Sequence, residues 1–257
     1  MLTDKSRRHL DAELQQWLSA GRSADIWWRD DDATAFTPAL QRLHALSEAS
    51  DAPIALACIP AKVDETLAAC IEAWPLASVW QHGYAHCNHA PLGEKKIELG
   101  PHRSPGTVIA ELQRGSRRLR ELFGVRFAAV LVPPWNRIDD TVLARLGDTT
   151  LSGLSTFKPR RQRNIDAGLW QVNTHVDLID WRGGGGFVGE DAAVSAICTH
   201  LRLRREGATD GAEPTGILSH HLVHDESVWQ FLSSWFAYVA EHRGLRLCAP
   251  QELHADA

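Results

Sequence analysis

Residues 26–33 read Ile-Trp-Trp-Arg-Asp-Asp-Asp-Ala, a short apolar run that ends in three consecutive aspartates. The apolar run is typical of a buried strand, so the aspartates are expected at its carboxyl end. Neighbouring carboxylates repel one another unless a cation or hydrogen-bond donors stabilise them. Successive strand side chains alternate in direction, so one aspartate can bind a metal while its neighbour faces an attacking water. An acidic helix cap or turn is the alternative interpretation.

Similar apolar runs alternate with segments of helical spacing along the whole chain. We expect strands at 26–28, 54–59, 78–81, 127–132, 151–157, 169–176, 216–219 and 245–248. Helical spacing predicts helices between and before them, as at Leu10, Leu14 and Leu18 ahead of Gly21. Such alternation is typical of parallel βαβ units. The sequence therefore predicts one α/β domain over residues 1–257, a (β/α) barrel with about seven parallel strands.

Polar clusters follow four of these expected strands. They are Asp30–Asp32, His82 with His86, Trp135–Arg137, and His220 with His221. The carboxyl ends of parallel barrel strands converge on one face, where the βα loops build active sites. Four clusters at these positions therefore predict a single functional site.

The spacing of His82 and His86 favours a metal within that site. In a helical turn, residues i and i+4 point the same way, so both imidazoles are expected to reach one cation. An aspartate from the first strand end would complete the ligand set. Two histidines and one carboxylate leave coordination positions open for water and substrate, which is typical of a catalytic site.

The composition excludes several other classes of protein. A net charge of −5 argues against a nucleic-acid binder. Five cysteines without a CxxC pair imply neither a disulfide framework nor a cysteine metal cluster. The N-terminus lacks an apolar signal region, and no apolar run is long enough to span a membrane. We therefore expect a reduced, cytoplasmic protein with neither a nucleic-acid nor a membrane partner.

Taken in order, these motifs resemble the polysaccharide deacetylase superfamily over nearly the whole chain. The family's first motif, a strand ending in Asp-Asp, is similar to Asp31-Asp32, with Asp30-Asp31 as the alternative register. The resemblance implies a distorted (β/α) barrel in which Asp31 is the catalytic base and Asp32 a metal ligand. The second motif, His-x-x-x-His, matches His82 and His86, which are implied to be the other two ligands.

The third motif of the family, a strand followed by Arg-x-Pro-Tyr, is only partly kept as Val132-Pro133-Pro134-Trp135. Trp135 takes the aromatic position, whose backbone N–H is implied to help form an oxyanion hole. Val132 stands where the family has arginine. Arg137 or Arg29 is expected to supply the missing positive charge.

The fourth motif, an Asp and a Trp that flank the pocket, is similar to Asp177 and to Asp180-Trp181. The fifth, Leu-x-His at the end of a strand, matches Leu218-Ser219-His220 and implies that His220 is the general acid. His221 and His224 lie in the same segment and are alternatives for that role. The residues expected to contact the substrate are Trp135, Arg137, Asp180 and Trp181.

The resemblance implies a metal-dependent hydrolase that removes an acyl group, usually acetyl, from an N-acylated sugar or a related amide. The bond broken is a carbon–nitrogen bond other than a peptide bond. Asp31 would accept the proton of the attacking water, and His220 would protonate the leaving nitrogen. Zinc is the expected cation for two histidines and an aspartate, and cobalt, nickel and iron also fit.

Two other functions are compatible with the sequence. Two histidines and a carboxylate also form the metal site of non-haem iron oxygenases, although those sites usually lie on antiparallel double-sheet folds. The missing arginine of the third motif is compatible with a carbohydrate-binding pseudo-enzyme of impaired activity.

Overall fold

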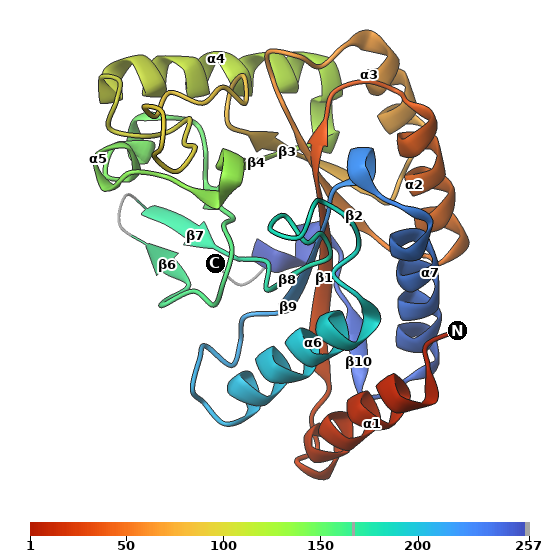
Figure 1. Ribbon diagram of the computed structural model, residues 1–257. Helices are drawn as coiled ribbons and strands as arrows, with labels where there is room; N and C mark the ends of the chain where they lie inside the picture. The colour runs from red at the N-terminus through yellow and green to blue at the C-terminus, as the bar shows by residue number, and fades with distance from the viewer. Residues whose placement is uncertain (166–167, 255–257) are drawn as a thin grey trace.

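The computed structural model describes residues 1–165 and 168–254 (Figure 1). Within these residues, ten strands form one curled, mostly parallel sheet. They are β1 (Ala24–Ala33), β2 (Ile54–Cys58), β3 (Ala77–His82), β4 (Phe127–Val132), β5 (Gly153–Leu154), β6 (Asn164–Ile165), β7 (Leu169–Gln171), β8 (Val176–Asp177), β9 (Thr215–Ser219) and β10 (Leu245–Leu247). Their order is β6-β7-β5-β4-β3-β2-β1-β9-β8, and β10 pairs with the first residues of β1.

Helices cover the outer side of the sheet (Figure 1). They are α1 (Asp4–Ser19), α2 (Pro38–Ala49), α3 (Glu65–Glu72), α4 (Pro105–Phe123), α5 (Asp140–Leu143), α6 (Glu190–Arg205) and α7 (Glu226–Glu241). Their starts follow the expected capping chemistry: Thr37 accepts the N–H of Leu40, and Asp64 accepts that of Leu67. The α/β class and the distorted barrel expected from the sequence are confirmed.

The longest strand, β1, separates two apolar cores by its alternation. Trp27 packs inside the curl of the sheet, with its ring 5.3 Å from that of Trp80. Trp28 faces the helices and packs 4.8 Å from Phe236 of α7. Odd-numbered residues of β1 therefore point into the barrel and even-numbered residues point toward the helices. This alternation determines where the aspartates that follow are directed.

The first aspartates belong to β1 rather than to a loop after it. The expected strand 26–28 extends to Ala33, because β2 and β9 pair with β1 as far as its acidic residues. The register with β2 shifts between Asp31 and Ala33, and Asp32 has a φ angle of 75°. Asp32 is thus the extra residue of a β-bulge, which re-aims its side chain.

The expected strand at 169–176 is wrong in its extent. The segment forms two short strands because it changes partner midway: β7 pairs with β5, whereas β8 pairs with β9. Since β5 and β9 lie on opposite sides of β1 in the sheet order, this segment brings the two ends of the curl together. Strand β6, which the sequence analysis missed, pairs antiparallel with β7.

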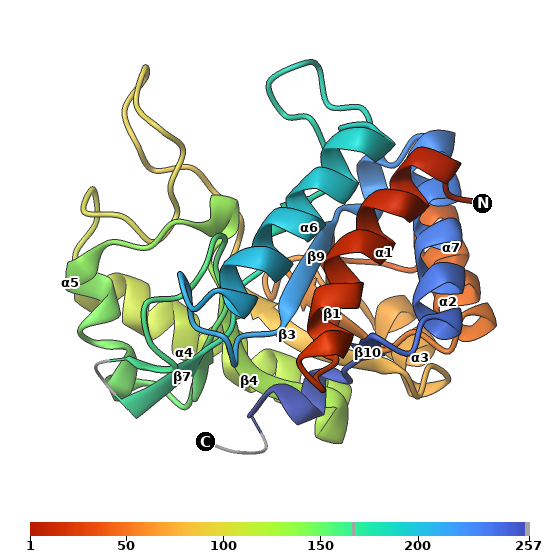
Figure 2. The ribbon, with the colours of Figure 1, turned by 90° about the horizontal axis from the view of Figure 1, so that it is seen from below.

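Helix α1 lies alongside α6 and covers the amino-terminal end of β1 (Figure 2). Its apolar residues Leu10, Leu14 and Trp17 are buried in the outer core. No helix among the described residues is both long and apolar enough to cross a membrane.

We expect Leu14→Ala to lower the free energy of unfolding by about 2–5 kcal/mol, because it leaves a cavity in the outer core. Urea denaturation followed by circular dichroism measures this change. The matched control is Leu92→Ala, since Leu92 is fully exposed and its loss should change stability by at most about 0.5 kcal/mol. Equal stability of the two variants would contradict the packing of α1 as part of the main core.

Candidate active site

Three polar side chains converge on one point: Asp32 at the end of β1, His82 at the end of β3 and His86 in the loop after β3. Asp32 Oδ1 lies 3.2 Å from His82 Nε2 and 3.3 Å from His86 Nε2. The three potential ligand atoms all lie within 4.8 Å of one another. The structure therefore brings together the three residues that the sequence predicted as metal ligands.

The hydrogen bond of His82 to Val132 indicates that the point shared by the three side chains fits a cation. Its Nδ1 lies 2.9 Å from the carbonyl oxygen of Val132, and a carbonyl can only accept, so Nδ1 carries the proton. In the neutral ring, Nε2 then presents a lone pair toward Asp32 Oδ1, which has no hydrogen-bond donor among the described residues. Two facing lone pairs repel unless a cation lies between them. The residues fit a divalent metal, whose histidine ligands usually donate their other N–H in this way.

The electrostatics of the two partners agree with that interpretation. Burial lowers the pKa of His82, but the neighbouring Asp31 and Asp32 carboxylates more than offset this and raise it above its ordinary value. Burial likewise raises the pKa of Asp32, yet the two imidazoles hold it well below its usual range. Without a cation, the contact therefore favours a protonated His82 ring beside an ionised Asp32, and a bound metal would take the place of that proton.

His86 reaches this point from a loop, so the expected helical turn is wrong. The described residues between His82 and α4 contain no helix, and both Gly83 and His86 have positive φ angles, of 55° and 54°. The buried carboxylate of Glu98 accepts the N–H groups of the two residues after Gly83. A Cβ at Gly83 would lie only 2.0 Å from Glu98 Oε2, so this tight approach requires glycine. Glu98 therefore holds the loop that carries His86.

Strained backbone is concentrated at the same place. Of the six described non-glycine residues with positive φ, four lie here: Asp32, His86, Trp135 and Asn136. Such conformations cost about 1–3 kcal/mol each and persist where surrounding contacts enforce them, often at functional sites. The ring of Trp135 lies 4.4 Å from that of His86, so this tryptophan borders the candidate metal site.

Asp31 points into the barrel, where it forms a buried ion pair with Arg29. The guanidinium contacts both carboxylate oxygens, at 2.9 and 3.0 Å, and both side chains are almost fully buried. Arg29 also donates to Ser155 Oγ and Asn136 Oδ1, both at 2.7 Å. Of the two arginines considered from the sequence, Arg29 is thus the one beside Asp31. Arg137 instead donates to the carbonyl of Lys96.

Asp30 points to the opposite side of β1 and contacts neither histidine of the candidate metal site. Its oxygens accept from Ser219 Oγ at 2.6 Å, from the backbone N–H of His221 at 3.0 Å and from the ring of His221 at 2.5 Å. Burial raises the pKa of Asp30, but His221 and Ser219 reverse this and hold it below its usual range. The alternative register, with Asp30 as base and Asp31 as metal ligand, does not match this arrangement.

His220 lies beyond the end of β9, beside the loop that follows β8. The ring of Trp181 meets it edge-on at 4.8 Å, and the indole N–H of Trp181 donates to Asp177 Oδ2 at 2.9 Å. Burial raises the pKa of Asp177, which the nearby His220 partly counteracts. The ring of His221 is turned to Asp30, and Nε2 of His224 accepts the backbone N–H of His220.

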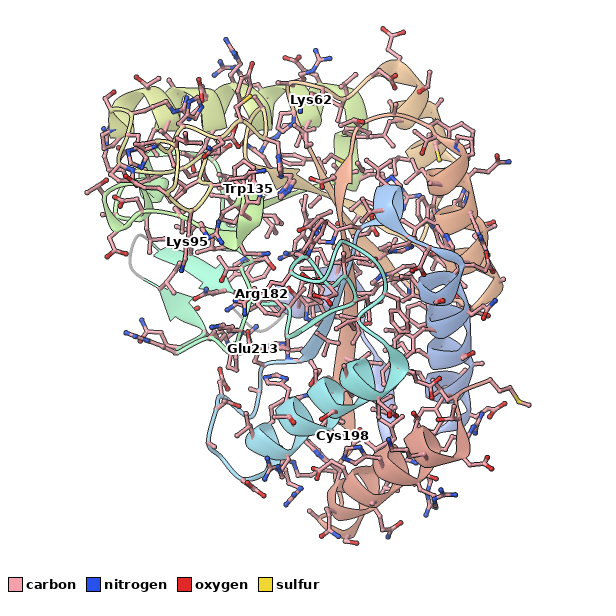
Figure 3. The ribbon with its side chains drawn as sticks, viewed as in Figure 1. Lys62, Lys95, Trp135, Arg182, Cys198 and Glu213 are labelled. Carbon is pink, nitrogen blue, oxygen red and sulfur yellow. The ribbon has the colours of Figure 1, made fainter. Side chains whose placement is uncertain are left out.

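Asp180 caps a turn, and its expected contact with substrate stays a prediction. Its Oδ1 accepts the backbone N–H groups of Arg182 and Gly183, so this carboxylate caps the turn after Trp181. In Figure 3, Arg182 lies between Trp135 and Glu213 in the view. Of the two aspartates that resemble the fourth motif, Asp177 is the one that contacts Trp181. Neither Asn136 nor Glu98 was singled out, because both act through contacts that no sequence spacing reveals.

A second group of potential ligands, His175, His200 and Glu213, lies elsewhere in the fold. Glu213 is well separated from Trp135 in Figure 3. Gly216 N–H donates to His175 Nδ1, so in the neutral ring Nε2 carries the proton and offers no lone pair. The two rings stack at 3.4 Å and 15°, which keeps their in-plane nitrogens parallel rather than convergent.

Burial above all lowers the pKa of His175 to about 3 and that of His200 to about 2, so this pair is neutral near pH 7. Meanwhile Glu213 accepts the backbone N–H groups of Arg160 and Asn173 and joins two loops. The group therefore has the chemistry of a structural cluster and does not fit a metal.

The sequence matches no protein-family model and no curated protein. Solved structures are similar over nearly the whole chain. A protein from Mycobacterium smegmatis described as a polysaccharide deacetylase has 13% identity and a TM-score of 0.68, covering 91% of this chain and 90% of its own. A family 4 acetyl xylan esterase from Clostridium thermocellum, in complex with a cobalt ion, has 13% identity and a TM-score of 0.54, covering 90% of each chain.

A third similar structure is a CE4 family pseudoenzyme from Bacillus anthracis, with 17% identity and a TM-score of 0.56 over 90% of this chain and 65% of its own. At sequence identities this low, the structural similarity concerns the fold alone. The chain has the fold of the polysaccharide deacetylases, as its sequence motifs predicted.

Proposed function

We propose that this protein is a metal-dependent deacetylase that hydrolyses the carbon–nitrogen bond of an N-acetylated sugar or a related amide. The observation that carries the proposal is the convergence of Asp32, His82 and His86 beside the buried Asp31–Arg29 pair. A cation site next to a carboxylate outside the ligand set is the arrangement that hydrolysis needs. The alternation and bulge of β1 are what separate the two aspartates.

Asp32, His82 and His86 would hold the metal, with zinc the expected ion and cobalt, nickel or iron also compatible. When bound, such a metal lowers the pKa of water and polarises a carbonyl. His82 is fixed for this role by Val132, and His86 by the loop that Glu98 holds.

Asp31 is the proposed general base. Its two oxygens contact Arg29, which fixes the orientation of the carboxylate inside the barrel. Arg29 in turn donates hydrogen bonds to Ser155 and Asn136, which fix its guanidinium and so the position of the Asp31 carboxylate. In this proposal Arg29 supplies the positive charge that the family's third-motif arginine would provide, since Val132 stands at that position.

His220 is the proposed general acid. His221 and His224 are less suited, because one ring is buried against Asp30 and the other accepts a backbone N–H. Trp181 and Asp177 flank His220 and would orient its ring. The proposed substrate contacts are Trp135, Arg137 and the exposed face of Trp181, and the N–H of Trp135 is the proposed oxyanion donor.

A catalytically impaired carbohydrate-binding protein is the second candidate. The replacement of the third-motif arginine by Val132 favours it, and one solved structure of this fold is a pseudoenzyme. The two candidates differ in whether acetate is released from a bound N-acetylated sugar.

We expect His82→Ala to abolish both metal retention and acetate release. Loss of a direct ligand should weaken metal binding by more than the roughly 10–100-fold that loss of a supporting contact causes. Elemental analysis and an acetate assay on N-acetylglucosamine oligomers measure the two effects. His9→Ala, on the exposed face of α1, is the control and should retain both. A His82→Ala protein that keeps one equivalent of metal would contradict the ligand assignment.

Asp31→Asn should retain the metal and lose turnover by about 10²–10⁴-fold, since the amide cannot accept the proton of water. Metal content measured on the same preparation shows whether the ligand set is intact. Turnover within a few-fold of the wild type would exclude Asp31 as the base. Loss of metal together with activity would instead identify Asp31 as a ligand.

A further inference from the structure

The Asp30 carboxylate lies in the protein interior, where a charged group is retained only if specific contacts stabilise it. It is completely buried on the helix-facing side of β1, where an unpaired charge would be strongly destabilising. Three donors satisfy it: the Ser219 hydroxyl, the backbone N–H of His221 and the ring of His221. The indole N–H of Trp28 donates to Ser219 Oγ at 2.9 Å, which leaves the hydroxyl proton free to point at Asp30.

These donors lie on both sides of His220 in the sequence. Asp30 is paired with Ser219 in the register of β1 and β9, so its side chain stands beside the end of β9. It binds the residue before His220 by its side chain and the residue after it by both backbone and ring. The backbone N–H of His220 itself donates to His224 Nε2 at 3.2 Å. The segment 219–221 is thus held at every residue.

The rings of His220 and His221 have different environments. His221 is 2% exposed, and its Nε2 is enclosed without a hydrogen-bond partner among the described residues, so it has no access to substrate. His220 is partly exposed and lies against Trp181 at the mouth of the candidate site. Holding the ring of His221 inward therefore directs the neighbouring His220 outward.

We propose that Asp30, acting through Ser219 and His221, is a positioning residue that places the ring of His220 for proton transfer to the leaving nitrogen. The inference rests on the proposed function and deepens it. Asp30 touches neither the metal ligands nor the substrate. A displacement of about 1 Å at a reacting group can lower a rate about 100-fold, so a rigid support for the acid has a large effect.

The test uses two probes that share an acetyl group and differ in the leaving group. The amide probe is an N-acetylglucosamine pentamer, whose leaving nitrogen must be protonated. The ester probe is 4-nitrophenyl acetate, whose leaving group departs without a proton. A misplaced general acid slows the first reaction and spares the second, whereas damage to the whole site slows both.

The variants are a matched pair at one position. His221→Leu fills the space but removes the ring donor to Asp30, whereas His221→Asn keeps an N–H at the place of Nδ1. We expect His221→Leu to lower kcat on the pentamer about 10–100-fold with little change in KM, while ester hydrolysis changes less than about threefold. His221→Asn should recover most of the loss. His220→Ala should show the same dependence on the leaving group.

Three results would overturn the proposal. Equal losses on both probes would make the contact merely structural, and unchanged kcat on the pentamer would show that the contact does not matter. Equal inactivity of His221→Asn and His221→Leu would mean that the His221 ring itself is the acid. If His221→Leu does not fold, Ser219→Ala takes its place in the test. This variant removes a single hydrogen-bond donor to Asp30 and leaves the His221 ring in place, and we expect the same dependence on the leaving group.

A readout that does not depend on turnover separates this inference from the proposed function. Proton NMR of the zinc-loaded protein should show a downfield resonance from the His221 Nδ1–H bonded to Asp30, absent in Asp30→Asn. A wild type that shows the resonance but releases acetate from neither probe would refute the proposed function, and the positioning role with it. An active wild type without the resonance would refute the positioning role alone.

Discussion

The structure depends on how the end of β1 directs three consecutive aspartates. Strand alternation sends Asp31 into the barrel and Asp30 toward the helices, and the bulge at Asp32 turns the third carboxylate to the histidines. Each carboxylate then meets a different partner. Asp30 contacts His221 and Ser219, Asp31 contacts Arg29, and Asp32 contacts the imidazoles of the two candidate metal ligands. Without the bulge, Asp32 would follow Asp30 onto the helix-facing side, and the candidate metal site would lack its carboxylate.

The buried Arg29–Asp31 pair also has an energetic cost that a functional role would explain. Taking two charges out of water costs several kcal/mol per ion, and their attraction often does no more than repay it. The pair is supported by Ser155 and Asn136, and Asn136 adopts a strained left-handed conformation. A buried ion pair and a strained backbone conformation therefore occur together at one end of the sheet. Apolar side chains packed in the same space would make the protein at least as stable.

Much of the fold could be predicted from the sequence because β1–β4 and the longer helices carry strong apolar patterns and clear caps. The prediction failed where local pattern does not determine the partner. The segment 169–176 contains neither glycine nor proline to mark a break, yet it pairs first with β5 and then with β9. The loop after His82 owes its shape to Glu98, fifteen positions beyond Gly83 and invisible to motif spacing. At the site, ligand types were predictable from chemistry, whereas the direction of Asp32 depended on the bulge and that of Asp180 on a turn.

The central claim is that one cation is held by Asp32, His82 and His86. Anomalous X-ray scattering at the zinc edge, from crystals grown with zinc, tests it most directly. The account predicts one strong peak at about 2.0–2.2 Å from Asp32 Oδ1 and from Nε2 of both histidines. A peak at His175, His200 and Glu213 instead, or no peak at the end of β1, would contradict it.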